Sequence, residues 1–336
     1  MSQPVVAVVG ATGAVGVEFL ELLDKRQFPL SALKLFATAR SKGKRMPFKG
    51  EELVVEELTA ESFKGVDIVL SSVEASVSRE FSPLAVKAGA VVVDNSSAFR
   101  MDPAVPLVVP EINGAEIAKH RGIIANPNCV AIIADMAIWP IHRRNPVRRL
   151  IVSAYQAASG AGAPAMEELL ESTRAYLEGR PFEPKVMPHP YAFNLFSHNT
   201  AIDPETGYNE EETKVRQETH KIFGDTDMRV SATCIRVPVL RAHSMALNFE
   251  CEYPITPTEV RHLLGDAPGV RLVEDPGRNY FPMPSDASGQ DDVLVGRIRQ
   301  DTSDRTGKGM TMFVCGDQLL KGAALNAVQI AEYLVQ

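Results

Sequence analysis

The chain has 336 residues and a formal net charge of -7. This length suits two domains, and the negative charge disfavours nucleic acids and anionic membrane surfaces as partners. The apolar run at the N-terminus stops at Gly10 with no basic region before it, which argues against a signal peptide, and the longest apolar stretch, Cys129–Ile141, is too short to span a bilayer. The four cysteines lack metal-ligand spacing, so we expect no metal site, reduced thiols and a cytoplasmic protein.

Short apolar runs alternate with helical spacing in the first third of the chain. The run Val5–Val9 is continuous, as expected for a strand buried on both faces. Further strands are predicted at Leu33–Ala37, Val66–Ser71 and Ala90–Asp94, and helices at Val15–Leu23 and Phe81–Lys87. Strands that alternate with helices form a parallel sheet through right-handed crossovers. Residues 1–128 therefore predict a Rossmann-like, doubly wound α/β domain that binds a nucleotide, and we expect a C-terminal helix in residues 321–336 to complete it.

The pattern changes in the second part of the chain. Strands of alternating or mixed character are predicted at Leu150–Gln156, Arg229–Pro238 and Ser244–Tyr253, and helices at Pro164–Glu178 and Glu210–Phe223. The proline-rich stretch Arg180–Pro190 predicts an extended loop. Because strands and helices no longer alternate one for one, residues 129–320 predict a second, α+β domain.

A glycine-rich loop follows the first predicted strand and opens the first predicted helix. It reads Gly10-Ala11-Thr12-Gly13-Ala14-Val15-Gly16. Glycines at these positions allow a tight turn and close approach of a pyrophosphate to backbone N–H groups at a helix N-terminus. The loop therefore predicts a dinucleotide site, with contacts from Gly10, Thr12, Gly13, Ala14 and Val15. The alternative is a turn with a structural role alone.

The end of the second predicted strand indicates which nucleotide binds. A cofactor without a 2′-phosphate usually meets an acidic residue there. This sequence instead has Thr38, Arg40 and Ser41, whose hydroxyls and guanidinium suit a 2′-phosphate. We therefore expect NADP rather than NAD, and the alternative is a solvated basic loop.

One cysteine stands apart from the other three. The segment Asn126-Pro127-Asn128-Cys129 precedes the apolar run Val130–Ile138, which Asn128 can cap as a helix. Cys129 would then lie in the first turn, where the helix dipole and free N–H groups favour a thiolate. From local chemistry alone a nucleophile and a buried structural thiol both remain open.

Longer ordered motifs give a resemblance that spans the whole chain. They include Asn126-Pro127-Asn128-Cys129, Asp94-Asn95-Ser96-Ser97-Ala98-Phe99-Arg100-Met101-Asp102, Tyr155-Gln156-Ala157-Ala158-Ser159-Gly160-Ala161-Gly162, Arg236-Val237-Pro238-Val239-Leu240-Arg241-Ala242-His243-Ser244 and Lys321-Gly322-Ala323-Ala324-Leu325-Asn326-Ala327. In these segments and in the glycine-rich loop the chain resembles the aspartate-semialdehyde dehydrogenases.

The resemblance implies roles for individual residues. Cys129 would be the nucleophile, Gln156 the residue that orients the thioester, and His243 the general acid/base. The residues that would bind substrate or phosphate are Arg100, Asn128, Glu211, Lys214 and Arg236, and further cofactor contacts would come from Ser72, Ser159, Gly160 and Gly162. These types fit the reaction, because an anionic acyl phosphate needs fixed cations and a thiolate needs a proton shuttle. His142, His189, His198 and His220 do not share in this pattern, and we expect them to be structural or exposed.

The sequence departs from the family pattern at four positions. Val130 and Ala131 stand where hydroxyl residues usually follow the cysteine, and Met245 stands where glutamate usually follows the His-Ser pair. Glu74 lies in a loop that is usually glycine-rich, so it adds bulk and negative charge beside the expected cofactor site. These changes predict weak activity, with His243 deprived of an orienting partner.

The leading hypothesis is an enzyme of amino-acid biosynthesis that interconverts L-4-aspartyl phosphate and aspartate semialdehyde with NADP, through a thioester at Cys129. A second hypothesis keeps this chemistry on another acyl phosphate. A third is a catalytically weak or silent paralogue with a structural or regulatory role, motivated by Val130, Met245 and Glu74. The resemblance also implies a homodimer formed by the second domain, with phosphate and a small molecule as the other partners.

Overall fold

The computed structural model describes residues 3–336, and these residues form two compact units. Unit 1 comprises residues 3–128 together with 322–336, and unit 2 comprises residues 129–321. Within residues 3–336, no helix combines the length and the apolar character needed to cross a membrane.

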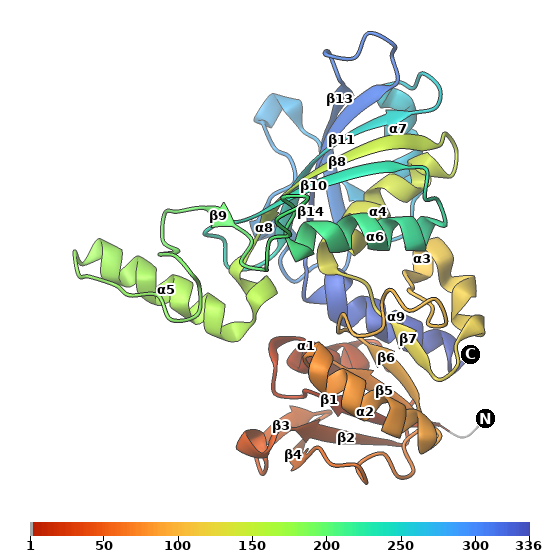
Figure 1. Cartoon of the computed structure of the whole chain (residues 1–336), viewed down its shortest axis with the longest axis vertical. Helices are drawn as coiled ribbons and strands as arrows, with labels where there is room; N and C mark the ends of the chain where they lie inside the picture. Colours follow the sequence, from red (N-terminus) through yellow and green to blue (C-terminus); the bar gives the residue numbers. More distant parts are fainter. Residues whose placement is uncertain (1–2) are drawn as a thin grey trace. The chain divides into compact units, whose positions relative to one another are not determined.

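Unit 1 is built on a seven-stranded sheet in the order β3-β4-β2-β1-β5-β6-β7 (Figure 1). All neighbouring strands are parallel except β3, which runs antiparallel to β4. The strands are β1 (Val5–Val9), β2 (Ala32–Ala37), β3 (Arg45–Phe48), β4 (Glu51–Glu57), β5 (Ile68–Ser71), β6 (Val91–Asp94) and β7 (Ile123–Ala125). The helices are α1 (Ala14–Lys25), α2 (Ala75–Lys87), α3 (Pro110–Asn113) and α9 (Leu325–Tyr333). This is the doubly wound arrangement predicted from the alternation of strands and helices.

The C-terminal helix belongs to the first unit because polar contacts tie it there. In α9 the Asn326 side chain donates to Asn126 Oδ1 at 2.7 Å and to the Val108 carbonyl at 2.9 Å. All three residues are nearly or fully buried, so each of these hydrogen bonds satisfies groups that would be costly to leave unpaired. The chain thus returns to its first sheet after completing the second unit.

Unit 2 also contains a seven-stranded sheet, in the order β12-β13-β14-β11-β8-β10-β9. Its strands are β8 (Val147–Gln156), β9 (Phe196–Ser197), β10 (Arg229–Arg236), β11 (His243–Cys251), β12 (Val270–Leu272), β13 (Val293–Gln300) and β14 (Gly309–Gly316). Its helices are α4 (Cys129–His142), α5 (Ala163–Leu177), α6 (Glu210–Phe223), α7 (Pro257–Gly265) and α8 (Pro284–Ala287). β10 pairs with β8 in parallel, whereas β11 pairs with both β8 and β14 in antiparallel. The mixed sheet fits the α+β character expected for this part of the chain.

The two faces of the second sheet differ in burial. On one face, which α4 and α6 contact, side chains such as Val152, Leu247 and Met312 are buried. Their neighbours along the strands, for example Ile151 and Asn248, point to the other face and stay partly exposed. This alternation is the expected signature of a sheet covered by helices on one side.

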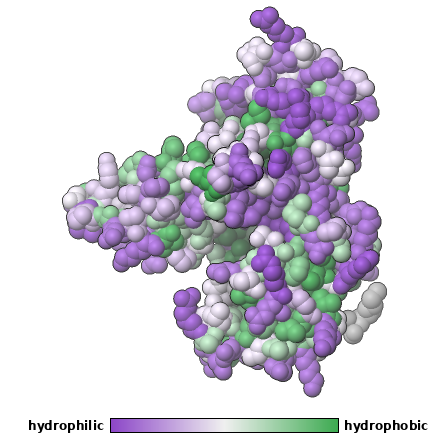
Figure 2. All heavy atoms as spheres, viewed as in Figure 1, coloured by the Kyte–Doolittle hydropathy of each residue, from purple (hydrophilic) through white to green (hydrophobic). Residues whose placement is uncertain are grey.

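Helix α5 lies away from the second sheet within unit 2 (Figure 1). It packs with the following loop around a small cluster of buried side chains: Ala158, Ala165, Leu169, Met187, Tyr191 and Phe196. Figure 2 shows apolar patches on the surface of this segment, where Tyr176, Leu177, Phe193 and Leu195 are each at least 60% exposed. An apolar surface of this kind marks a candidate protein contact.

Candidate active site

The glycine-rich loop of unit 1 makes a tight turn between β1 and α1. Gly10 has a φ of +84°, and a Cβ built on it would lie 2.2 Å from the Ser72 carbonyl oxygen. At Gly16 a Cβ would lie 2.3 Å from the Gly10 carbonyl oxygen. Only glycine fits either position, so the loop can hold the N-terminus of α1 open to a phosphate.

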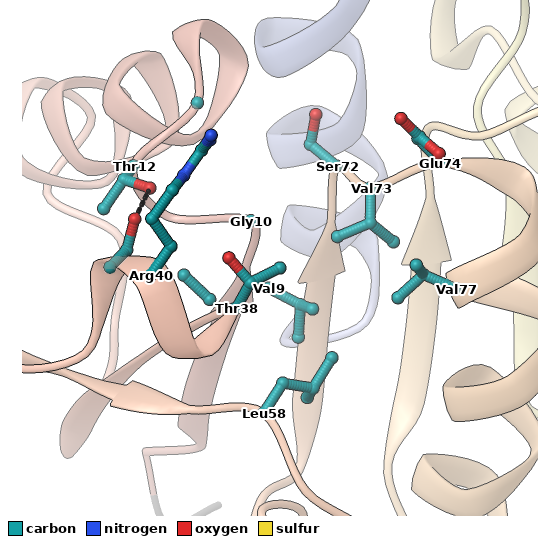
Figure 3. Close-up of a pocket in the computed structure, with 13 residues that line it drawn as sticks. Val9, Gly10, Thr12, Thr38, Arg40, Leu58, Ser72, Val73, Glu74 and Val77 are labelled. Carbon is teal, nitrogen blue, oxygen red and sulfur yellow. Dashed lines mark hydrogen bonds between the residues drawn. The ribbon is translucent and has the colours of Figure 1, made fainter.

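Beside this loop lies a cavity of about 640 Å³ in unit 1. Its apolar walls come from Val9, Leu58, Val73 and Val77, and its polar rim includes Gly10, Thr12, Thr38, Arg40, Ser41, Ser72 and Glu74 (Figure 3). A flat apolar ring can lie against such walls while the rim meets phosphates, which is the distribution expected of a nucleotide site. These residues therefore fit the adenosine part of a dinucleotide.

The positive and the negative side chain on the rim of the cavity lie on opposite sides of it. Thr12 lies on the same side of the cavity as Arg40, whereas Glu74 lies across the cavity from them (Figure 3). The Ser41 hydroxyl lies 3.1 Å from the Thr12 hydroxyl. Arg40 and Glu74 are both exposed. A phosphate would meet two hydroxyls and a guanidinium on the Arg40 side, and the Glu74 carboxylate is not on that side.

The predicted phosphate-binding residues of unit 1 are buried. Arg100 donates from Nε to the Asn126 carbonyl at 2.9 Å and from Nη2 to the Asn95 carbonyl at 2.6 Å. These contacts fix the guanidinium between the segments that follow β6 and β7. Asn128 is also buried and immediately precedes α4.

Three polar residues meet at one end of the second sheet, on the face that α4 and α6 contact. Gln156 ends β8, Arg236 ends β10, and His243 begins β11. β8 and β10 are parallel, so their carboxyl ends coincide, and Arg236 pairs in register with Gln156. β11 is antiparallel to β8, so its amino end lies at the same edge. Residues far apart in the chain are thereby collected into one site.

Cys129 is the first residue of α4, and this helix passes over the same end of the sheet. Ile133, one turn further on, lies against Gly316, where a Cβ would be 2.9 Å away, and Gly316 pairs in register with His243. Cys129 is partly exposed, whereas the remaining cysteines are buried. Burial raises the pKa of the Cys251 and Cys315 thiols to about 12 and also raises that of Cys234. The N-terminus of α4 favours a thiolate at Cys129, whereas burial within the second sheet disfavours a thiolate at the other three cysteines.

The ring of His243 is held by the backbone rather than by a neighbouring carboxylate. The Ala157 N–H donates to His243 Nδ1 at 3.0 Å, so a neutral ring carries its proton on Nε2, which has no hydrogen-bond partner in the described part of the chain. Burial, and then the charge of Arg236, lower the pKa of His243 to about 3. The prediction that Met245 deprives His243 of an orienting partner is therefore wrong. Met245 is fully buried within β11, a place that suits an apolar side chain and would penalise a carboxylate.

Arg236 is almost completely buried, at 3% exposure, and several acceptors surround it. Nη2 lies 2.8 Å from His198 Nε2, Nη1 donates to the Ala157 carbonyl at 3.3 Å, and Nε and Nη2 both lie 3.4 Å from Asn199 Oδ1. His198 was expected to be structural or exposed and outside the site pattern. The structure instead places it directly against the predicted carboxylate-binding arginine.

The two predicted substrate-binding residues of α6, Glu211 and Lys214, differ in burial. Glu211 is buried and accepts a hydrogen bond from Gln156 Nε2 at 3.0 Å. The other amide atom of that side chain, Gln156 Oε1, is buried and has no partner among residues 3–336. Lys214 is partly exposed, and its Nζ lies 3.7 Å from Glu210 Oε2. Gln156 and His243 thus each present an unsatisfied polar atom beside Arg236.

The segment after β8 supplies the wall of this site. Gly160 is exposed, and a Cβ built on it would lie 2.9 Å from His243 Cε1 and 3.2 Å from Arg236 Nη1. The neighbouring Ser159 hydroxyl accepts a hydrogen bond from Gln318 Nε2, and Gln318 Oε1 accepts the Ala242 N–H at 2.9 Å. Gln318 therefore ties the segment that follows β8 to the residue before His243.

Two family models match the chain. The model described as "Semialdehyde dehydrogenase, NAD binding domain" matches residues 5–120, and the one described as "Semialdehyde dehydrogenase, dimerisation domain" matches residues 138–321. The chain is 55% identical to the aspartate-semialdehyde dehydrogenase of Synechocystis sp., covering 100% of this chain and 99% of that protein. It is 47% identical to the aspartate-semialdehyde dehydrogenase of Bacillus subtilis, covering 98% of this chain and 96% of that protein.

A solved structure gives the same result. The crystal structure of aspartate-semialdehyde dehydrogenase II from Vibrio cholerae, complexed with ASA, superposes with a TM-score of 0.96 at 41% identity and covers 100% of this chain and 99% of that one. The chain belongs to the aspartate-semialdehyde dehydrogenase family. Membership confirms the resemblance drawn from the sequence motifs, and the chain is an oxidoreductase of this kind. The comparisons do not favour a silent paralogue or a different acyl phosphate as substrate.

Within this family fold, unit 2 brings together Gln156, Glu211, Arg236 and His243. Arg100 and Asn128 are buried in unit 1, and Ser159, Gly160 and Gly162 belong to unit 2. Sequence reasoning missed His198 and Gln318. No local motif marks either residue, and the one signal available for His198 was its place on the polar stretch between two predicted elements.

Proposed function

We propose that this family member interconverts L-4-aspartyl phosphate and aspartate semialdehyde through a thioester at Cys129. The observation that carries the proposal is the convergence of Gln156, Arg236 and His243 at one end of the second sheet, beneath the helix that Cys129 begins. In the oxidative direction the thiolate attacks the aldehyde carbon, loss of hydride gives the thioester, and a phosphate oxygen then displaces the thiolate. In the biosynthetic direction each of these bonds forms and breaks in reverse.

The residues of unit 2 divide the work of this reaction. His243 is the proposed acid/base group: its fixed ring carries the proton on Nε2, which is unpaired in the described chain. It can donate this proton toward the oxygen that forms when the thiolate attacks the aldehyde, and it takes the proton back as hydride leaves and the C=O bond re-forms. Arg236 binds the substrate carboxylate, and Glu211 binds the substrate amino group. Gln156 orients the thioester, while Lys214 of this unit and Arg100 and Asn128 of unit 1 bind phosphate.

NADP is the cofactor that the first unit fits best. When bound it would accept or supply the hydride. Gly10, Gly13, Ala14 and Val15 present backbone groups at the start of α1, and the hydroxyls of Thr12, Thr38 and Ser41 with Arg40 line the side of the cavity suited to a 2′-phosphate. Ser72 borders the same cavity, and Ser159, Gly160 and Gly162 are the contacts proposed from unit 2.

We further propose a homodimer in the cytoplasm. The match to a dimerisation domain, the partly exposed face of the second sheet and the apolar surface around α5 support self-association. A nucleophilic thiol stays usable in a reducing compartment, which supports the location.

An absorbance assay for NADPH tests the activity. Aspartate semialdehyde is oxidised with NADP, with and without phosphate, by the wild type and by Cys129→Ala. We expect phosphate-dependent NADPH formation by the wild type and none by Cys129→Ala. In parallel, calorimetry should show tighter binding of NADPH than of NADH, and Arg40→Ala should reduce that preference. A wild-type rate equal to that of Cys129→Ala would refute the proposed reaction, and equal affinity for both nucleotides would refute the cofactor assignment.

A further inference from the structure

The contact between His198 and Arg236 assigns a proton to one nitrogen of the histidine. A guanidinium only donates hydrogen bonds and stays charged. His198 Nε2, 2.8 Å from Arg236 Nη2, must therefore accept, and the ring must be neutral with its proton on Nδ1. That proton points to Thr200 Oγ1, which lies 3.2 Å from His198 Nδ1.

The same contact continues into α6. Thr200 Oγ1 also accepts the Glu211 backbone N–H at 3.3 Å, so a chain of hydrogen bonds runs from Arg236 through His198 and Thr200 to the helix that carries Glu211. Burial lowers the pKa of His198 to about 4, which keeps the ring neutral and able to accept. Arg236, His198 and Glu211 are all buried, so this chain of hydrogen bonds lies in the interior of unit 2.

We propose that His198 is a positioning residue that holds the guanidinium of Arg236 in the orientation that receives the substrate's carboxylate. The inference rests on the proposed role of Arg236. Among the side-chain acceptors, the Asn199 amide oxygen lies at 3.4 Å from both Nε and Nη2, beyond a normal hydrogen-bond length, whereas His198 lies at 2.8 Å. His198 is the side chain that fixes the rotation of the guanidinium, and it leaves the Nη1 side next to Gly160 and His243 for substrate.

Two substitutions at His198 separate positioning from packing. The side-chain amide introduced by His198→Gln keeps a neutral acceptor near the position of Nε2, whereas His198→Leu removes the acceptor and keeps an apolar side chain of similar bulk. His262→Leu, on an exposed side chain of α7, is the matched control. All four proteins are assayed on aspartate semialdehyde and on propanal, which lacks the carboxylate and the amino group.

We expect His198→Leu to raise KM for aspartate semialdehyde by about 10-fold, as for the loss of one hydrogen bond to a charged group, while kcat changes less. Activity on propanal should be unchanged, and His198→Gln should restore most of the loss. Equal losses on both substrates would show a structural role, and an unchanged KM would show no role; either result overturns the proposal.

A second measurement does not depend on turnover. Iodoacetate carries a carboxylate and iodoacetamide does not, so the ratio of their rates with Cys129 reports how well Arg236 receives an anion. We expect this ratio to fall in His198→Leu and to recover in His198→Gln, with the iodoacetamide rate constant throughout. If the wild type fails to oxidise aspartate semialdehyde yet the ratio falls, the proposed function fails and the positioning role stands. If the ratio is unchanged in His198→Leu, the positioning role is refuted.

Discussion

Gly160→Ala tests the geometry of the site with the smallest possible change. The added Cβ would lie 2.9 Å from His243 Cε1, 3.0 Å from His243 Nε2 and 3.2 Å from Arg236 Nη1. Carbon atoms pack at about 3.5 Å or more, so the ring must yield by about 0.6 Å. His243 is fully buried and fixed by the Ala157 N–H, and Arg236 is held by His198. Neither neighbour can move without losing a hydrogen bond.

The size of this displacement gives the expected loss of catalytic rate. A misplacement of 1 Å at a reacting group can cost about 100-fold, so we expect kcat/KM of Gly160→Ala to fall by roughly 10-fold to 100-fold. Gly265→Ala is the matched control, because a Cβ there meets only Leu272 at 3.8 Å. Both variants are assayed for phosphate-dependent oxidation of aspartate semialdehyde, and calorimetry with NADPH shows whether cofactor binding has changed. A Gly160→Ala enzyme as active as the control, or one whose whole defect lies in weaker NADPH binding, would refute the crowding of His243 and Arg236.

Two further predictions concern the thiols and a buried acid. Cys129 should be alkylated by iodoacetamide faster than the three buried cysteines, Cys234, Cys251 and Cys315, as read by mass spectrometry after a brief exposure; a Cys129 no faster than these would remove the case for a nucleophile. Burial raises the pKa of Asp135 well above 3.8, so over a range of pH the folded state keeps a proton that the unfolded chain has lost. The free energy of unfolding therefore falls as the pH rises from the pKa of the unfolded chain through the raised pKa of the folded state. Asp135→Asn cannot ionise and retains an acceptor for Thr219, whose hydroxyl donates at 2.9 Å in the wild type. Its melting temperature should therefore exceed that of the wild type by a margin that widens from about pH 5 to about pH 8, and a constant or shrinking margin would contradict the raised pKa.

Sequence reasoning located the strongly patterned elements of unit 1. The apolar runs at β1, β2, β5 and β6 alternate with helical spacing and so predicted a parallel sheet, and the run at β1 is continuous because that strand is buried on both faces. The ribbon of β3 and β4 was not predicted, since β4 (Glu51–Glu57) is rich in charge and largely exposed, and β3 forms the edge of the sheet. Edge strands tolerate charged side chains, so their sequence resembles that of a loop.

In the candidate site, the sequence by itself determined which reactive and charged side chains are available and that one cysteine, Cys129, begins a helix. A helix start follows from a polar residue before an apolar run, as at Asn128 and Cys129, and this is a local relation. The resemblance to the family added the roles of residues that lie far apart, and family membership is confirmed by the comparisons.

Only the tertiary structure decided what holds those residues in place. The partner of His243 is a backbone N–H of Ala157, and the partner of Arg236 is His198, 38 positions earlier in the chain. Neither contact has a sequence signature, because both arise at the edge of a mixed sheet where β8 and β10 end and β11 begins. Strand order and register are set by the packing of the whole unit, so the sequence could supply an acid/base group and a guanidinium, while only the folded sheet could orient them.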